Sequence, residues 1–358
     1  MINGITYTME WINKKNGELK KGKSDKGLIE KATKALHLLE ELSKTELEFI
    51  FKGGTSLLLL LDELHRFSID IDIITDEENM GEVIENELTK VISNSNVFTR
   101  YEENKRTNSS GVPKAHYKFY YESLVGKKDS HILLDVLYEK NHYTEVIQRS
   151  VDCSLVKCDG QEIKVTMPSI DCILGDKLTA YAPNTTGIPY GVGKELEIIK
   201  QLFDVANLFE EMKDIDAVRE TFKQMAEQEL SYRGKHKELS YIDVLDDIFN
   251  TSKALSAEGR VDAEDYKKLA DGVRRIKGFI LTQNYVIESA INSASKAAYL
   301  ALILKHDIKE IEKFDPSINL KEYVIDDLNF PRFERIKKRN PEAYFYWHKS
   351  IAILHNIK

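Results

Sequence analysis

The sequence KGGTSLLLLLDELHRFSIDIDI, from Lys52 to Ile73, joins a double-glycine turn to an alternating acidic segment. Apolar and polar residues alternate strictly over residues 68–74, which predicts a β-strand. On that strand the isoleucines face one side, and Asp70 and Asp72 face the other. Two carboxylates one pleat apart repel each other when they are unpaired, but they can share a hard divalent cation. The segment therefore predicts a strand that carries a site for Mg²⁺ or Mn²⁺.

The turn before this strand has the composition of a phosphate-binding loop. Gly53 and Gly54 allow the backbone to approach an anion closely. A helix predicted from Thr55 or Ser56 to about Leu64 would offer free N–H groups and the positive end of its dipole, and the two hydroxyl groups add donors. A double glycine or an Asp-x-Asp segment alone is common, but the combination is more specific. It predicts a phosphate cradle beside a metal site.

A third acidic residue lies on another predicted strand. In residues 131–138 (HILLDVLY), Asp135 shares one face with Leu133 and Leu137. A carboxylate on an apolar face is costly unless it is paired or bound to a metal ion. Three carboxylates on two neighbouring strands form a two-metal arrangement for attack on a nucleotide α-phosphate. One ion activates the acceptor oxygen, and the other holds the triphosphate.

These patterns together resemble a known family. The residues K-G-G-T-S-L at 52–57, R-x-S-x-D-x-D at 66–72 and the single strand acid Asp135 resemble the AbiEii/AbiGii toxin family of polymerase-β-like nucleotidyltransferases. The 14 residues between Thr55 and Asp70 slightly exceed the usual gap of the superfamily and resemble the toxin branch.

Two downstream segments extend the resemblance. The residues DKLTA at 176–180 are similar to the family's lysine motif, and residues 200–208 are similar to its K-x-x-x-D-x-x-x-L motif. The resemblance covers about residues 30–215. On the residues alone, Lys177 and Asp204 suit a surface position or an ion pair. The resemblance implies that Lys177 offsets triphosphate charge and that Asp204 orients it or contacts the nucleotide.

The resemblance implies a fold and a set of site residues. The fold is α/β (α+β), with a minimal polymerase-β-like nucleotidyltransferase core that contains a mixed sheet, followed by a mostly α-helical C-terminal domain. The implied catalytic residues, of which the first three are metal ligands for Mg²⁺ or Mn²⁺, are Asp70, Asp72, Asp135, Lys177 and Asp204. The implied nucleotide-binding residues are Lys52, Gly53, Gly54, Thr55, Ser56, Arg66, Ser68, Lys177 and Lys194.

The implied function is metal-dependent transfer of a nucleoside monophosphate from an NTP to a hydroxyl acceptor, with tRNA or another RNA as the first candidate. The resemblance also implies the toxin of a toxin–antitoxin or phage abortive-infection system, with a separately encoded antitoxin. Some family members are described mainly as GTP binders. Two alternatives stay open: a nucleotidyltransferase that modifies a small molecule or a protein hydroxyl, and a non-catalytic NTP-binding module.

Periodicity predicts an α/β half followed by a helical half. We expect a polar, irregular or weakly helical lead-in over residues 1–27, the α/β core over 28–167 and a helical domain over 168–358, of which 168–215 completes the active site. The predicted helices span 28–47, 55–64, 80–93, 168–181, 194–212, 215–230, 240–255, 262–283, 285–305 and 341–355. The predicted strands span 48–52, 68–74, 97–102, 116–122, 131–138 and 162–166, with a turn at 108–113.

Composition narrows the class of protein. Among 358 residues the formal net charge is −8, which excludes a uniformly basic nucleic-acid-coating protein. Neither an apolar run of membrane-spanning length nor a signal-peptide pattern is present, so a cytoplasmic protein without a membrane partner is expected. Three cysteines are too few for a disulfide framework or, without paired histidines, a zinc site. The segment GIPYGVGK at 187–194 is one residue too long for a Walker A loop.

Two segments are locally basic, at residues 14–26 and 332–349. The second leads into the aromatic run Tyr344 to Trp347. Basic groups attract a phosphate backbone, and exposed aromatic rings stack on unpaired bases. A terminal helix with so many aromatic residues usually packs them inward, and both interpretations hold if only the basic turn at 332–339 faces outward. We expect that turn to help hold an RNA acceptor.

Overall fold

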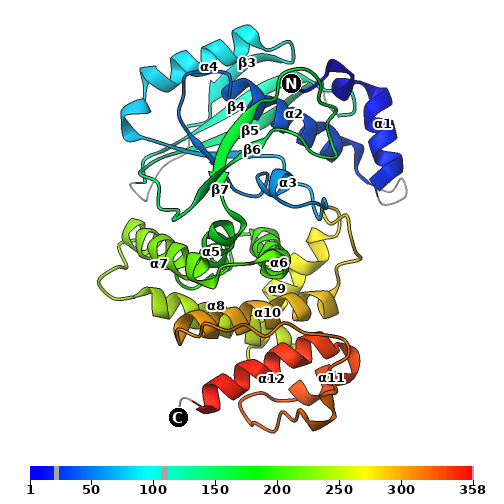
Figure 1. Cartoon of the computed structure of the whole chain (residues 1–358), viewed down its shortest axis with the longest axis vertical. Helices are drawn as coiled ribbons and strands as arrows, with labels where there is room; N and C mark the ends of the chain where they lie inside the picture. Colours follow the sequence, from blue (N-terminus) through cyan, green and yellow to red (C-terminus); the bar gives the residue numbers. More distant parts are fainter. Residues whose placement is uncertain (20–23, 106–111, 127, 357–358) are drawn as a thin grey trace. The chain divides into compact units, whose positions relative to one another are not determined.

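The computed structural model describes residues 1–19, 24–105, 112–126 and 128–356 (Figure 1). The chain divides into two compact units. The first unit contains Met1–Ser169 together with Gly278–Gln283, and the second contains Ile170–Lys277 together with Asn284–Lys358. Most of the turn expected at 108–113 and part of the lysine-rich segment at 14–26 lie outside the described residues.

A mixed five-stranded sheet forms the centre of the first unit, which confirms the predicted fold class. Its order is β1-β2-β5-β4-β3, and only the β2–β5 pair is parallel. The parallel pair requires a crossover connection, whereas β4 and β5 are antiparallel neighbours in sequence. The strands are β1 (Ile50–Lys52), β2 (Ile71–Thr75), β3 (Phe98–Glu103), β4 (Lys114–Glu122) and β5 (Asp129–Tyr138).

Two helices, α2 (Lys26–Leu42) and α4 (Glu82–Asn94), pack on one face of this sheet (Figure 1). Alternate residues of the strands are buried, among them Ile71, Ile73 and Leu134 at 0–1% exposure. The residues between them on each strand, including both acidic positions of β2 and β5, are partly exposed. Alternation therefore separates an apolar face from a polar face.

Three parts of the first unit differ from the prediction. The helix expected over 55–64 is a single turn, α3 (Leu57–Leu60). The lead-in contains a regular helix, α1 (Met9–Glu18), because Trp11 and Ile12 are buried and the Trp11 indole donates to the carbonyl of Leu155 at 2.9 Å. An unpredicted strand, β6 (Val146–Ser150), pairs with β7 (Lys164–Pro168) in a separate two-stranded sheet.

The second unit is helical, as its periodicity predicts. Its C-terminal elements pack together through buried aromatic side chains. Phe333, Tyr344 and Trp347 belong to one core cluster and are 0–1% exposed. Its helices are α5 (Ile170–Ala180), α6 (Glu195–Glu211), α7 (Ile215–Tyr232), α8 (Tyr241–Ser256), α9 (Ala263–Ile276), α10 (Ile287–Lys305), α11 (Ile336–Arg339) and α12 (Pro341–Asn356).

The helix expected over 262–283 ends at Ile276, because the chain then joins the first unit in an extended conformation. There the amide of Phe67 donates to the carbonyl of Phe279 at 3.0 Å, and the amide of Leu281 donates to the carbonyl of His65 at 2.8 Å. The segment that leads into the acidic strand is thus held by residues far away in the sequence. Within the described residues, every helix is too short or too polar to cross a membrane.

Candidate active site

The two acidic strands are neighbours, as the sequence predicts. In the parallel β2–β5 pair, Asp72 lies directly opposite Asp135, and on the other side of β2 it lies opposite Lys52 of β1. Residues directly opposite each other across a sheet project from the same face. Lys52, Asp72 and Asp135 therefore form a row across three strands, and all three are partly exposed.

The double-glycine turn packs directly against this row. Gly53 has a φ of +80°, and a Cβ atom at this position would lie 2.0 Å from Oδ2 of Asp72. A Cβ on Gly54 would lie 2.7 Å from Oγ of Ser68 and 2.8 Å from Nη2 of Arg66. Gly53 is required by both its positive φ and its contact with Asp72, whereas a side chain on Gly54 would force Ser68 and Arg66 to move. The turn thus brings its backbone against Asp72, Ser68 and Arg66, all of which belong to the predicted site.

The hydroxyl groups after the glycines hold the turn together. Oγ1 of Thr55 donates to the carbonyl of Asp70 at 2.5 Å, and Oγ of Ser56 donates to the carbonyl of Gly53 at 2.8 Å. Both side chains are fully buried. In the structure these hydroxyl groups donate within the protein and so position the turn, while the assignment of Thr55 and Ser56 to the nucleotide stays a prediction. The helix α3 has only one turn, so it is too short to give a substantial helix dipole for phosphate binding.

Asp135 has a partner that sequence reasoning missed. On β4, His116 lies directly opposite Asp135, and its Nδ1 is 2.6 Å from Oδ1 of the carboxylate. This contact explains why a carboxylate is tolerated on a largely apolar strand face. The alternation of β4 could have placed His116 on the polar face, because it puts His116, Lys118 and Tyr120 on one side of the strand. The register that brings His116 to Asp135 is a property of the sheet.

The donor set suits a hard divalent cation. Asp70, Asp72 and Asp135 offer only carboxylate oxygens, which Mg²⁺ and Mn²⁺ prefer over softer ligands. At Gly53 the turn presents backbone and no side chain to Asp72, since a Cβ atom there would lie 2.0 Å from Oδ2. The residues present therefore fit a metal ion at the acidic end of the turn.

The remaining predicted residues lie in the second unit. Nζ of Lys177 on α5 is 2.9 Å from Oδ2 of Asp204 on α6, and it also donates to Oε1 of Gln201 at 3.2 Å. The side chains of Lys177 and Asp204 are 8% and 1% exposed, so this is a buried ion pair. Lys194 directly precedes α6, and its side chain is exposed. The structure thus joins Lys177 with Asp204, whereas the glycine turn, Asp72 and Asp135 lie together in the first unit.

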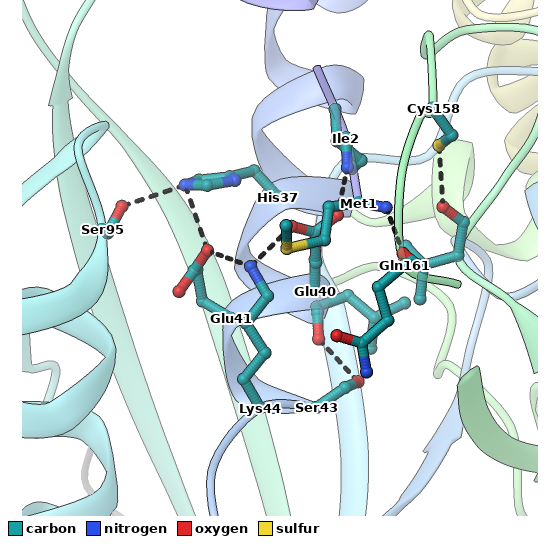
Figure 2. Close-up of polar contacts among 12 residues, drawn as sticks. Met1, Ile2, His37, Glu40, Glu41, Ser43, Lys44, Ser95, Cys158 and Gln161 are labelled. Carbon is teal, nitrogen blue, oxygen red and sulfur yellow. Dashed lines mark hydrogen bonds and ion pairs between the residues drawn. The ribbon is translucent and has the colours of Figure 1, made fainter. Parts of the chain in front are cut away.

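A second polar cluster, formed by His37, Glu40 and Glu41 on α2, has the composition of a metal site but is already satisfied (Figure 2). Nδ1 of His37 is 2.9 Å from the hydroxyl of Tyr7, and Nε2 is 3.0 Å from Oγ of Ser95. The ammonium of Lys44 lies 2.7 Å from Glu40 and 2.8 Å from Glu41. Because Lys44 supplies the cation and both ring nitrogens are engaged, this cluster fastens α2 rather than holding a metal ion.

The burial of His37 in this cluster predicts that the folded protein loses stability in acid. Burial, helped by the charges of Lys34 and Lys44, lowers the pKa of His37 to about 3. In the unfolded chain the pKa of a histidine is near 6.5. Between about pH 6.5 and pH 3 the unfolded chain therefore binds more protons than the folded chain, so the free energy of unfolding falls as the pH drops below about 6.5. We expect about 2 kcal/mol of the free energy of unfolding to be lost through His37 between pH 7 and pH 5.

Urea unfolding of His37→Gln at both pH values checks this expectation. The variant should show a pH dependence weaker by about that amount, because glutamine does not titrate. His236→Gln, at an exposed histidine, is the matched control and should follow the wild type. Parallel pH profiles for the wild type and His37→Gln would contradict the assignment.

Known proteins resemble this chain in sequence or in structure. A family model described as nucleotidyl transferase AbiEii toxin, type IV toxin–antitoxin system, matches residues 37–277. The fold is similar to that of JHP933 from Helicobacter pylori at 16% sequence identity and a TM-score of 0.42, over 78% of this chain and 94% of that one. A second H. pylori structure, of a candidate nucleotidyltransferase, is similar at 17% identity with the same TM-score and coverage. No curated protein matches the sequence.

Proposed function

This chain belongs to the nucleotidyl transferase AbiEii toxin family of type IV toxin–antitoxin systems, and from that premise we propose that it transfers a nucleoside monophosphate from an NTP to a hydroxyl group of RNA, with tRNA as the first candidate. The reaction joins the acceptor oxygen to the α-phosphorus, and the bond to the β-phosphate breaks so that pyrophosphate leaves. The proton of the acceptor hydroxyl passes to a base of the enzyme.

The observation that supports this proposal most strongly is the pairing of Asp72 with Asp135 beside the turn at Gly53. Two carboxylates on adjacent strands concentrate negative charge at one point, while the adjoining turn exposes backbone rather than side chains. This combination suits a triphosphate that arrives with a divalent cation. When bound, Mg²⁺ or Mn²⁺ would neutralise charge on the triphosphate and on the attacking oxygen.

The chain's own residues have separate tasks in this proposal. Asp70 and Asp72 hold the cation, and Asp135 completes its ligand set or accepts the acceptor's proton. His116, which contacts Asp135 at 2.6 Å, fixes the direction of that carboxylate. Gly53 and Gly54 bring the turn against the phosphates.

Cationic residues complete the assignment. Lys52 lies beside Asp72 in the sheet, and Arg66 is in close reach of Gly54. We assign both of them, together with Lys194, to the phosphates of the bound nucleotide. Lys177 offsets triphosphate charge, and Asp204 orients its ammonium at 2.9 Å.

Family membership implies an NTP substrate and an antitoxin. We propose that the antitoxin is separately encoded and that the toxin acts in the cytoplasm, where NTPs and tRNA are found. We also propose a role in phage defence.

Incubation of the protein with each of the four NTPs, labelled at the α-phosphate, and with total bacterial RNA tests the proposal. We expect one NTP to label an RNA of tRNA size in the presence of Mg²⁺ and not in EDTA, with release of one pyrophosphate per label. The β-labelled and γ-labelled forms of the same NTP are the control and should leave the RNA unlabelled.

The alternatives give different results in the same experiment. Label in a protein band or in a small molecule would identify a different acceptor. Tight NTP binding without pyrophosphate release would identify a non-catalytic nucleotide-binding module. Either result would overturn the assignment of RNA as the acceptor.

A further inference from the structure

The second unit contains a cavity of about 580 Å³ whose lining is strongly basic. It lies between the end of α8 and the segment 331–339, which includes α11. We call this cavity the basic pocket. The cationic side chains that line it are Arg260, Arg332, Arg335, Lys337, Lys338 and Arg339, and the acidic ones are Glu258 and Glu334. Its local charge is thus +4 on a chain whose net charge is −8.

The cations of the basic pocket are only partly neutralised by the protein itself. Arg339 forms an ion pair with Glu258, and Nζ of Lys337 donates to the carbonyl of Tyr323 at 2.6 Å. The side chains of Arg332, Arg335 and Lys338 are exposed and, within the described part of the chain, form no hydrogen bond or ion pair. Three cations in seven consecutive residues therefore lack an anion.

The backbone holds these cations in place. Phe333 and Ile336, at 1% and 3% exposure, anchor the segment in the same core cluster as Trp347. Arg332 has a φ of +70° and Glu258 a φ of +49°. Among the described residues only three non-glycine positions have a positive φ, and two of them line the basic pocket. Such a conformation costs on the order of 1 kcal/mol and persists where packing enforces it, which is frequent at ligand sites.

The aromatic residues that follow the basic pocket do not take part in binding. Tyr344, Phe345, Tyr346 and Trp347 are all at 0–1% exposure, so their rings cannot stack on the bases of a ligand. Recognition at this place therefore depends on charge and on the planar guanidinium groups, which match phosphate oxygens in pairs.

From these observations we propose that the basic pocket binds phosphate groups of the RNA backbone and so helps to hold the acceptor. This inference rests on the proposed function for the identity of the ligand. Contacts to phosphates position a nucleic acid without reading its sequence, so we expect binding here to be independent of sequence. Nearly all of the basic residues lie beyond residue 277, where the family match ends.

The charge-reversal variant Arg335→Glu/Lys338→Glu tests the proposal, because both side chains are exposed and unpaired in the described structure. The measurement is fluorescence anisotropy of a fluorescein-labelled tRNA transcript at several KCl concentrations, in EDTA and without NTP. We expect the affinity for the transcript to fall about tenfold at physiological salt. The slope of log K against log salt should become shallower by about 1.4 to 1.8, the value for two lost phosphate contacts.

The matched control is Lys237→Glu/Lys267→Glu, which changes the net charge equally at two other exposed lysines of the second unit. It should bind the transcript with less than a twofold change. Equal affinity and slope for Arg335→Glu/Lys338→Glu and the wild type would overturn the proposal. A second result would also overturn it: pyrophosphate or poly-L-glutamate displaces the transcript as effectively as unlabelled tRNA does at an equal concentration of negative charge.

The binding measurement needs neither metal nor NTP, so it stands apart from the transfer reaction. If RNA receives no label from any NTP but Arg335→Glu/Lys338→Glu still weakens tRNA binding, the proposed function fails and the basic pocket stands. If RNA is labelled and the same variant binds and labels it like the wild type, the basic pocket fails and the proposed function stands.

Discussion

Asp72→Asn should lower nucleotidyl transfer about a thousandfold or more, which corresponds to roughly 4 kcal/mol of transition-state stabilisation. The substitution keeps the shape of the side chain but removes one of the negative charges that would hold the divalent cation. Folding should be kept, because Asp72 is partly exposed on the polar face of β2 and takes no part in the buried face.

Three measurements separate a lost site from a lost fold. Transfer of labelled nucleotide should disappear, while the melting temperature of the metal-free protein stays within a few degrees of the wild type. The rise in melting temperature that Mn²⁺ produces by binding the folded protein should be absent in the variant. The control Asp76→Asn, at an exposed carboxylate just beyond the same strand, should keep both transfer and the Mn²⁺ effect. Transfer within tenfold of the wild type by Asp72→Asn would remove Asp72 from the site.

Lys177→Met should reduce the free energy of unfolding of the second unit by about 3–5 kcal/mol. The substitution leaves the carboxylate of Asp204 without its ammonium at 1% exposure, and an uncompensated buried charge is costly. The double variant Lys177→Met/Asp204→Leu removes both charges and should recover most of the loss. Urea unfolding followed by circular dichroism at the helix band measures all three proteins. A loss below 1 kcal/mol for Lys177→Met would contradict a buried, interacting pair.

The stable double variant also separates support of the fold from contact with the nucleotide. If the ammonium of Lys177 offsets triphosphate charge, the double variant should bind NTP at least tenfold more weakly and NMP with less than a twofold change. Equal losses for NTP and NMP would mean that the pair of Lys177 and Asp204 supports only the helices. Titration calorimetry with the NTP selected by the transfer experiment, and with its NMP, gives both affinities.

Much of the first unit is readable from local sequence. The alternation of Ser68 to Ile74 predicts a strand and assigns Asp72 to its polar face, and the structure confirms this face for Asp72. The strand β2 begins only at Ile71, so Asp70 precedes it instead of lying one pleat from Asp72 on the same strand. The helical periodicity after residue 194 likewise predicts helices α6 to α8 within a few residues. These features depend on short-range repeats, because a helix or strand in a packed protein must place its apolar residues on one side.

Predictions from local sequence were wrong for elements whose ends or whose formation depend on residues far away in the sequence. The leucine run at 57–61 has the composition of a helix, but α3 stops at Leu60 because the chain must turn toward the bridge with residues 279–281. That bridge also ends α9 early, at Ile276. The strand β6 has no clear alternation, and it forms through pairing with β7.

The sequence by itself determined the class of the fold, the polar face of the acidic strand and the glycine turn before it, since each follows from residue types at short spacing. The tertiary structure alone decided that Asp135 lies opposite Asp72 and that His116 contacts Asp135. It also decided that the hydroxyls of Thr55 and Ser56 donate hydrogen bonds to the backbone carbonyls of Asp70 and Gly53. The reason is physical: the register between strands is set by how their buried faces share one core, and no local pattern contains that information.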